Sequence, residues 1–353
     1  MEAPPEAPPA PPPTAVPETW QVSDERPRVR PGDSPGTGDR IFLGLSIGSG
    51  TIVLMIMGLV GIFLGYRAFE ALSDAGFDFL TVQAWEPSTH HFGIAAVLFG
   101  TVLIGLTAVI IAVPLAVGTA LYISEYAPRR LQRTFISLVD LMAAVPSVVY
   151  GLWGAFFLQG HVIDISRFVS KYFGWFPPFS VNDTDGRVDP DNPLSSPTVY
   201  TSSTFIAGLV VGMMITPIVS SIMREAFMQA PPGEREGAYA LGATRWGMIR
   251  AVVLPYGRGG MIGGTMLGLG RALGETIAVY MIISPVFTIQ WHLLQNGAIS
   301  VSSLIALRYG ESQGLALSAL FAAGFALFLM TLVVNFVAST VVARSRSGAG
   351  SEA

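Results

Sequence analysis

Long runs of apolar residues with almost no charge constrain this chain more than any other feature. About half of the 353 residues (51%) are hydrophobic and only 12% are charged, whereas soluble domains carry about a quarter charged residues. About 20 helical residues cross the roughly 30 Å hydrocarbon core of a bilayer, and six runs are long enough. They lie near 41–66, 92–122, 135–158, 204–223, 259–287 and 314–342. We therefore predict an all-α, polytopic membrane protein with six transmembrane helices.

The segments outside these runs divide the rest of the chain. Residues 1–40 hold 11 of the 25 prolines, and a segment with so few large apolar groups cannot offset its ordering entropy. We expect a disordered, proline-rich cytoplasmic tail there. The other expected parts are a transmembrane domain over 92–342, external loops at 67–91 and 160–203, a cytoplasmic loop at 230–258 and a cytoplasmic tail at 343–353.

The distribution of basic residues indicates the orientation in the membrane. The connecting segments on the cytoplasmic side of a membrane carry an excess of arginine and lysine. If both termini are cytoplasmic, the cytoplasmic segments hold 14 basic residues and the external segments hold five, with Arg271 left inside a span. We therefore expect a multi-pass protein with both ends in the cytoplasm.

Composition also excludes several kinds of chemistry. The chain has no cysteine, which removes disulfides, thiolate metal sites and cysteine nucleophiles. The net charge of −4 argues against a general nucleic-acid binder. The four histidines show no metal-ligand spacing. Residues 182–186 faintly resemble a calcium loop but lack its full alternation of oxygen ligands and its closing glutamate, so a solvated turn is expected, with calcium as the alternative.

The cytoplasmic segment between the fourth and fifth runs reads as a compact helical unit. We predict a short helix over 236–241, a glycine stop at Gly242, a second amphipathic helix, and a return to the membrane at Pro255. Such a unit can transmit force as a rigid body. The alternative is an ordinary interfacial hairpin.

The same segment resembles the signature loop of bacterial ABC-importer permeases. That signature is Glu-Ala-Ala, three residues, Gly, nine residues, Ile, one residue and Leu-Pro, and two positions depart from it here, Gly237 and Val252. The resemblance implies a coupling helix that docks in a groove of a separate ATPase subunit. The matching residues are Glu236, Ala238, Gly242, Leu254 and Pro255.

Glycines recur at four-residue spacing in the fifth run. This spacing places small residues on one helix face and lets neighbouring helices approach closely. The glycines expected to serve helix packing are Gly260, Gly264, Gly268, Gly270 and Gly274.

An arginine lies in the middle of this run. Arg271 is twelve residues from Gly259, about 18 Å at 1.5 Å per residue, and an arginine at that depth should face the protein interior or a wet pathway. Glu275 lies one helical turn further and can pair with it. One interpretation is a structural ion pair. The other is an anion site, in which the guanidinium offers forked donors to a tetrahedral oxyanion and Glu275 limits the attraction.

Two stretches resemble the permease subunits of the phosphate-specific ABC importer, of the PstC type. They are Gly-Leu-Gly-Arg-Ala-Leu-Gly-Glu-Thr-Ile-Ala-Val at 268–279 and Val-Pro-Ser-Val-Val-Tyr-Gly-Leu-Trp-Gly at 145–154. The resemblance covers about 41–343. It implies the type I ABC-importer permease fold, a place in the bacterial inner membrane, and a role in phosphate translocation for Arg271 and Glu275.

The resemblance also implies partners. They are a homologous PstA-like permease, a PstB-like ATPase dimer and an external PstS-like phosphate-binding protein. The only lysine, Lys171, lies in an external segment, so this chain has no Walker A site and we expect no enzyme activity and no bound cofactor. ATP would be used by the partner ATPase. The alternatives are a permease for molybdate or sulfate, and an ion-coupled secondary transporter.

Overall fold

The computed structural model describes residues 36–181 and 197–346. Packing divides the chain into two units, Met1–Met57 and Gly58–Ala353. The helices, helical turns and strands are α1 (Thr37–Ala75), α2 (Asp78–Thr81), β1 (Trp85–Glu86), η2 (Pro87–Thr89), β2 (His91–Phe92), α3 (Ala95–Leu121), η3 (Tyr122–Tyr126), α4 (Arg129–Ala143), α5 (Ser147–Trp153), η4 (Gly154–Leu158), α6 (Gln159–Phe173), η5 (Pro177–Phe179), η6 (Pro197–Tyr200), α7 (Thr204–Met228), α8 (Pro232–Ala240), α9 (Arg245–Met248), η7 (Ile249–Val253), α10 (Leu254–Tyr256), α11 (Arg258–Leu273), α12 (Ile277–Ile282), α13 (Val301–Arg308) and α14 (Leu315–Arg346).

The first unit contains the N-terminal part of α1. Large apolar side chains there, such as Phe42 and Leu54, are more than 70% exposed. A helix that is apolar on all sides suits a lipid environment. The expected disordered tail at 1–40 lies mostly outside the described residues, and α1 already begins at Thr37.

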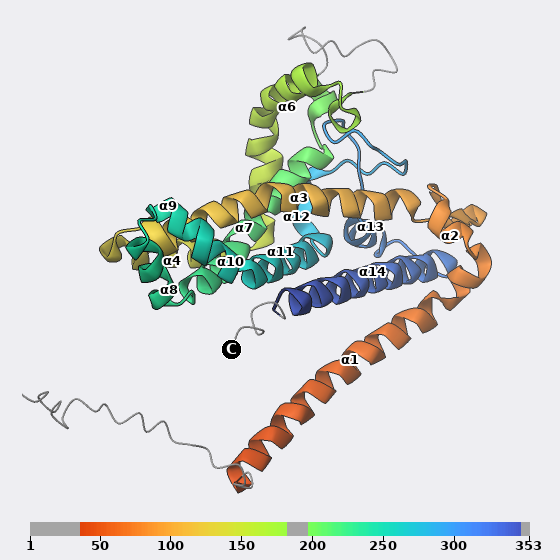
Figure 1. Cartoon of the computed structure of the whole chain (residues 1–353). Helices are drawn as coiled ribbons and strands as arrows, with labels where there is room; N and C mark the ends of the chain where they lie inside the picture. The colour runs from red at the N-terminus through yellow and green to blue at the C-terminus, as the bar shows by residue number, and fades with distance from the viewer. Residues whose placement is uncertain (1–35, 182–196, 347–353) are drawn as a thin grey trace, which may run out of the picture. The chain divides into compact units, whose positions relative to one another are not determined.

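Four long helices build the second unit. Figure 1 shows α3, α7, α11 and α14 running alongside one another, with α11 in contact with each of the other three. The α3–α7 contact is close because glycines lie at it. An ideal Cβ on Gly208 would come within 2.5 Å of Thr107, and one on Gly212 within 2.9 Å of the Ala108 carbonyl oxygen.

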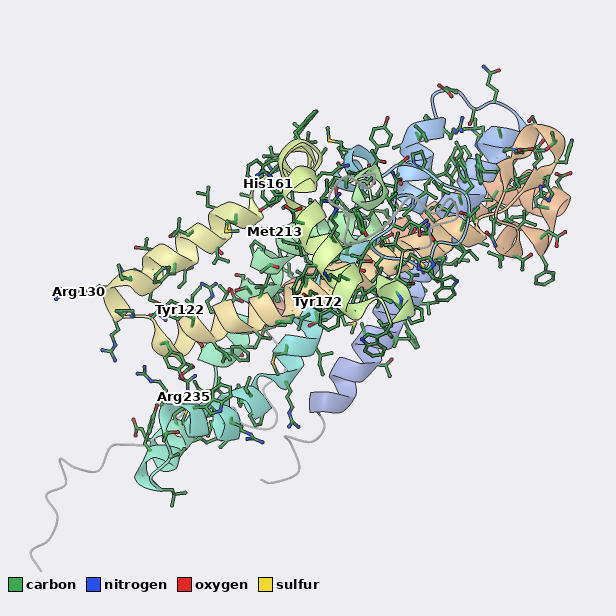
Figure 2. All side chains as sticks on the ribbon, turned by 90° about the horizontal axis from the view of Figure 1, so that it is seen from above. Tyr122, Arg130, His161, Tyr172, Met213 and Arg235 are labelled. Atoms are coloured by element: carbon green, nitrogen blue, oxygen red, sulfur yellow. The ribbon has the colours of Figure 1, made fainter. Side chains whose placement is uncertain are left out.

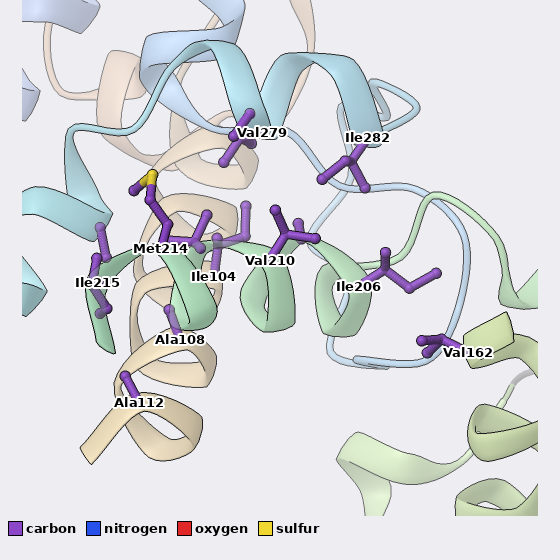
Figure 3. Close-up of a cluster of buried hydrophobic side chains, with 14 residues drawn as sticks. Ile104, Ala108, Ala112, Val162, Ile206, Val210, Met214, Ile215, Val279 and Ile282 are labelled. Carbon is purple, nitrogen blue, oxygen red and sulfur yellow. The ribbon is translucent and has the colours of Figure 1, made fainter. Parts of the chain in front are cut away.

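An apolar core lies mainly between α3, α7 and the short helix α12. Figure 3 shows Ile104 of α3, Val210 and Met214 of α7, and Val279 and Ile282 of α12 meeting in one cluster. Each of these side chains is at most 2% exposed. Burial of this kind contributes about 25 cal/mol for each Å² of apolar surface removed from water. The cluster anchors the short helix α12 against α3 and α7.

Five stretches are long and apolar enough to cross a membrane, among the residues that the structure describes. All five overlap predicted runs: four overlap those at 41–66, 92–122, 204–223 and 314–342, and the fifth overlaps the second half of the run at 135–158. The stretches are Thr37–Ala75, Ala95–Tyr126, Ser147–Phe173, Thr204–Met228 and Leu315–Thr340.

The predicted run at 135–158 is not one continuous helix. α4 ends at Ala143, and Pro146 stands immediately before α5. Proline has no N–H to donate, and it disfavours the helical conformation of the residue before it. The predicted external loop at 160–203 is also wrong in its first part, because α6 continues the helical path to Phe173. Figure 1 shows α6 pointing away from α3.

The predicted run at 259–287 is also broken. α11 ends at Leu273, α12 covers only Ile277–Ile282, and no regular helix follows until α13. Glycine at 274 weakens helix continuation because it has a high backbone entropy. This break explains why the run is absent from the membrane-spanning stretches, and it shapes the candidate site.

The external loop predicted at 67–91 contains regular structure. α1 extends through its first part, and a small antiparallel hairpin pairs Trp85 with Phe92 and Glu86 with His91. The chain is mostly helical, as expected, with this one pair of strands in the described part. At the other end, α14 extends to Arg346, into the tail expected from 343 onward.

Candidate functional site

The break between α11 and α12 lies between the two predicted pathway residues and leaves Arg271 exposed and Glu275 buried. Gly274 caps α11 with φ −92° and ψ −2°, and α12 starts three residues later. Arg271 lies in the last turn of α11. Glu275 lies in the connection itself. The end of α11 therefore lies between the two residues, and their side chains are no longer placed one helical turn apart on one helix face.

Arg271 is exposed in this single chain. Its guanidinium forms no ion pair with any residue that the structure describes. Around it, α11 is built from glycine, alanine and leucine. A charge within such an apolar helix must face protein or water, because hydrocarbon solvates it poorly. The side chain is therefore available to a partner or a substrate.

Glu275 makes different contacts from the expected pair with Arg271. Its side chain is 8% exposed, and Oε1 accepts a hydrogen bond from the backbone N–H of Ala278 at 3.2 Å. Its carbonyl oxygen accepts from Ser302 Oγ at 3.0 Å. The predicted Arg271–Glu275 pair is therefore not formed. The helix break diverts the carboxylate to the first turn of α12, where it satisfies a backbone donor.

The two stretches on which the family resemblance rested meet in space. An ideal Cβ on Gly151 of α5 would lie 2.9 Å from Ala278 Cα in α12, and one on Gly154 would lie 2.8 Å from Ile282 Cδ1. These contacts hold α5 directly against the helix that follows the break. Glycine is needed at both positions because a side chain would separate the two helices.

One polar residue near Arg271 escaped the sequence analysis. Asn335 belongs to α14, and its Oδ1 would lie 3.4 Å from an ideal Cβ on Gly270. Its side chain is exposed. The available signal was a lone asparagine in the apolar stretch 325–338. Polar residues within spans are costly and often mark pathways.

Three of the five glycines face α7. An ideal Cβ on Gly260 would overlap the Ala226 Cβ, and one on Gly268 would lie 2.6 Å from Val219 Cγ2. Gly264 approaches the Val219 carbonyl oxygen at 3.3 Å by the same measure. Gly270 instead faces α14. Gly274 has only atoms of its own helix within 4 Å, so it ends α11 and does not pack against a neighbour, contrary to expectation.

The predicted cytoplasmic loop forms a compact unit of short helical segments, α8, α9, η7 and α10, which we call the coupling knob (232–257). α8 ends at Ala240, and Gly242 two residues later has a φ of +84°, the left-handed conformation that glycine adopts without strain. Gly242 N–H donates to the Tyr239 carbonyl at 2.9 Å, and Ala243 N–H donates to the Ala238 carbonyl at 3.0 Å. This is the Schellman arrangement. The helix starts at Pro232, four residues earlier than predicted.

The second half of the coupling knob has its own cap and returns to the bundle. Thr244 Oγ1 accepts from Gly247 N–H at 3.2 Å and starts α9. The π-helical turn η7 follows, then α10 with Pro255 in its first turn. Leu254 packs against a buried cluster that includes Met248 and Val253. The unit is therefore attached to the bundle by an apolar contact.

The outer face of the coupling knob is unusually apolar. Leu241 is 91% exposed and Trp246 is 56% exposed. Glu236 is also exposed, whereas Ala238 packs against the cluster beneath. The signature residues are thus divided, with some in the attachment to the bundle and others on the free surface. Exposed apolar groups with charged neighbours mark protein interaction sites.

A cavity of about 380 Å³ lies near the end of α12. Its lining is mainly apolar and contains neither Arg271 nor Glu275, so it is separate from the candidate anion site. The residues that line it are Ala155, Phe156, Tyr280, Met281, Ile283, Pro285, Ile299, Ser303 and Leu307.

Comparison with known proteins places this geometry in context. Residues 112–347 match the family model described as binding-protein-dependent transport system inner membrane component. The chain is 40% identical over 316 residues to phosphate transport system permease protein PstC 2 of Mycobacterium tuberculosis, covering 88% of this chain and 94% of that protein. It is 35% identical over 315 residues to PstC of Mesorhizobium japonicum, covering 88% and 92%.

A solved structure shares the fold. A chain of a bacterial ABC transporter involved in the import of the acidic polysaccharide alginate superposes with a TM-score of 0.54 and 18% identity, covering 86% of this chain and 96% of that one. At this identity the likeness concerns the fold alone. It agrees with the expected type I ABC-importer permease architecture.

Proposed function

Since the chain belongs to the family of binding-protein-dependent transport system inner membrane components, we propose that it is a permease subunit of an ATP-driven importer of inorganic phosphate. The substrate follows from the curated relatives, which are phosphate transport permeases of similar length. The observation in this chain that carries the proposal is Arg271, an exposed arginine without an ion-pair partner among the described residues, at a helix break inside the apolar bundle.

Arginine suits this substrate. Its planar guanidinium presents several N–H donors that match two oxygens of a tetrahedral oxyanion at once. Because Glu275 bonds to the start of α12 instead, the donors of Arg271 are available to the anion. In this proposal Arg271 binds phosphate in transit, and Glu275 acts as a positioning residue that holds the break in shape.

The exposure of Arg271 supports a pathway completed by a second permease. A phosphate path cannot run along a surface that faces lipid, since a charged group there is costly. A homologous PstA-like subunit would cover this face and close the path. An external PstS-like binding protein would deliver the anion, and a PstB-like ATPase dimer would supply the energy. The chain itself would bind no cofactor.

The coupling knob is the proposed docking site for the ATPase. The apolar side chains of Leu241 and Trp246 project from a unit that is capped at each helix and packed against the bundle. Movement of the ATPase would displace this unit as a rigid body and change the helix packing behind it. This requires a cytoplasmic coupling knob, which agrees with the excess of basic residues in segments on that side and with cytoplasmic termini.

The proposal is tested by reconstitution. The chain is produced with its neighbouring permease, ATPase and binding protein, and uptake of labelled phosphate into proteoliposomes is measured with and without ATP. We expect uptake that needs ATP and the ATPase subunit. Uptake that persists without the ATPase would indicate a secondary transporter. If sulfate or molybdate blocks the uptake of labelled phosphate when it is added at the same concentration as phosphate, the result would indicate that the substrate is a different oxyanion.

A further inference from the structure

A largely buried ion pair joins the coupling knob to η3, the π-helical turn that continues α3. Glu125 Oε2 accepts a hydrogen bond from Arg235 Nη1 at 3.1 Å, and Oε1 lies 3.1 Å from the same nitrogen. The two side chains are only 5% and 21% exposed. They are separated by 110 residues in sequence. Figure 2 shows Arg235 at the same end of the bundle as Tyr122.

The same arginine reaches a second helix. Arg235 Nη2 donates to the backbone carbonyl of Phe227 at 2.6 Å, in the last turn of α7. A single guanidinium from α8 therefore contacts the ends of both α3 and α7. A forked, rigid group is well suited to bridging two acceptors at a fixed angle.

The π-helical turn η3, which holds Glu125, receives further contacts. The Arg245 guanidinium lies 5.2 Å from the centroid of the Tyr126 ring, and Gln132 Nε2 donates to the Ile123 carbonyl at 3.1 Å. Segments α4, α8 and α9 thus converge on one turn. π-Helical turns interrupt the regular hydrogen bonding of a helix and are frequent at functional sites.

A largely buried ion pair of this kind is better suited to fixing the relative position of two segments than to increasing the stability of the fold. Removing two charges from water costs much of what their attraction gains, and the apolar cluster beneath the coupling knob already binds it to the bundle. We propose that Glu125 and Arg235 are positioning residues that fix the coupling knob to the ends of α3 and α7, so that a displacement imposed by the ATPase moves both helices together. This inference rests on the proposed transport function.

The two helices lead back to the break beside Arg271. An ideal Cβ on Gly105 of α3 would lie 2.9 Å from Leu273 Cδ2, next to that break, and α7 packs on α11 at Gly268. A movement of α3 and α7 as one body would therefore be transmitted to the segment that carries Arg271. Loss of the ion pair should leave only the apolar cluster to link the coupling knob to α3 and α7, so that the knob and the two helices move together less strictly.

The test measures coupling in the reconstituted four-component importer. Glu125→Gln and Arg235→Gln are compared with wild type for phosphate taken up per ATP hydrolysed, in proteoliposomes that contain equal amounts of assembled complex. We expect this ratio to fall about fivefold or more, which is the lower end of the effect that one coupled site commonly has on another. ATP hydrolysis should continue. The double variant should be no worse than either single variant. Matched controls are Asp140→Asn and Arg130→Gln, which change exposed charges of α4 and should leave the ratio unchanged.

A cross-link provides the second measurement. The chain has no cysteine, so Glu125→Cys with Arg235→Cys introduces one defined pair, and a bifunctional thiol reagent should restore the ratio that the double substitution lowers. An unchanged ratio in the glutamine variants, or a cross-link that restores nothing, overturns the inference. So does failure of every variant to assemble, since the pair would then serve folding. If wild type takes up no phosphate, the proposed function fails instead.

Discussion

At the scale of single residues, the spatial relation of Arg271 and Glu275 is the main departure from expectation. Regular helical spacing placed them on one face, and either a structural pair or an anion site followed from that. The break after Leu273 separates them, and the carboxylate bonds to Ala278 N–H. The arginine is left without a carboxylate partner in the described part of the chain, which favours the anion site.

Replacement of Arg271 by glutamine should remove phosphate uptake and leave assembly largely intact. Charge-assisted hydrogen bonds contribute about 1.5–3 kcal/mol, so uptake should fall roughly ten- to hundredfold. Lysine should restore it only in part, because it lacks the planar fork. Labelled phosphate uptake by the reconstituted importer measures the effect. A complex that fails to assemble with the glutamine variant would support a structural role instead.

Substitutions of Glu275 separate a capping role from an ion pair. Glutamine retains an oxygen that can accept from Ala278 N–H, so Glu275→Gln should keep most of the thermal stability of the complex. Glu275→Ala leaves that donor unsatisfied and should cost about 1 kcal/mol. The check is the apparent Tm of the purified complex for both variants. Equal losses in the two would contradict the capping role.

At the scale of elements, glycines decide which helices approach closely. Four-residue spacing predicted the close approach at Gly260, Gly264 and Gly268, and the structure places all three against α7. The spacing could not say which neighbour each glycine would meet. Gly274 fits the same spacing but ends the helix, because local spacing does not report where tertiary packing interrupts a helix.

A matched pair of glycines tests this packing. Gly260→Leu places a side chain where Ala226 already lies, while a Cβ on Gly263 meets nothing within 4 Å. Overpacking costs about 1–3 kcal/mol, so Gly260→Leu should lower the yield and Tm of the complex, whereas Gly263→Leu should change neither. Similar behaviour of the two variants, measured by size-exclusion chromatography and thermal unfolding, would count against a close α7–α11 contact.

The elements that sequence reasoning missed share a physical cause. Hydropathy finds runs that are apolar throughout, so α1, α3, α7 and α14 were predicted, with boundaries that differ from the observed ones by one to nine residues except at the start of α7. α6 escaped because Asp164, Arg167 and Lys171 lower its hydropathy. Its buried positions Val162 and Ser166 lie one helical turn apart, a weak signal because serine is not apolar.

At the scale of the whole molecule, several candidate functional residues lie on surfaces that a single chain leaves exposed, among them Arg271, Leu241 and Trp246. The signature of the coupling knob could be found from sequence because its spacing is local. The Glu125–Arg235 pair could not, because it joins residues 110 positions apart. The same is true of the contact between Gly151 and Ala278. Long-range contacts are set by the fold and leave no local periodic pattern.

The outer face of the coupling knob should control assembly. Leu241→Asp puts a charge at a position that is 91% exposed, so the chain should still fold, but the ATPase should bind more weakly. Loss of an interface anchor costs about 2 kcal/mol or more, which is roughly thirtyfold in affinity. Co-purification of the ATPase measures this. Phe77→Asp, at another 90% exposed position, serves as control, and equal retention of the ATPase by both variants would refute the docking site.

Arg271, which has no ion-pair partner among the described residues, has a consequence for the energetics of crossing the membrane potential. An anion that enters a cell with a negative interior must move against about 2.3 kcal/mol for each charge and each 100 mV, and a divalent anion against twice that. A fixed positive charge beside the helix break provides a local electrostatic minimum partway across, which lowers the barrier to crossing. It cannot change the difference between the two sides. In the proposed importer the ATPase would supply that difference, so the surface proposed to dock the ATPase would matter as much as the arginine.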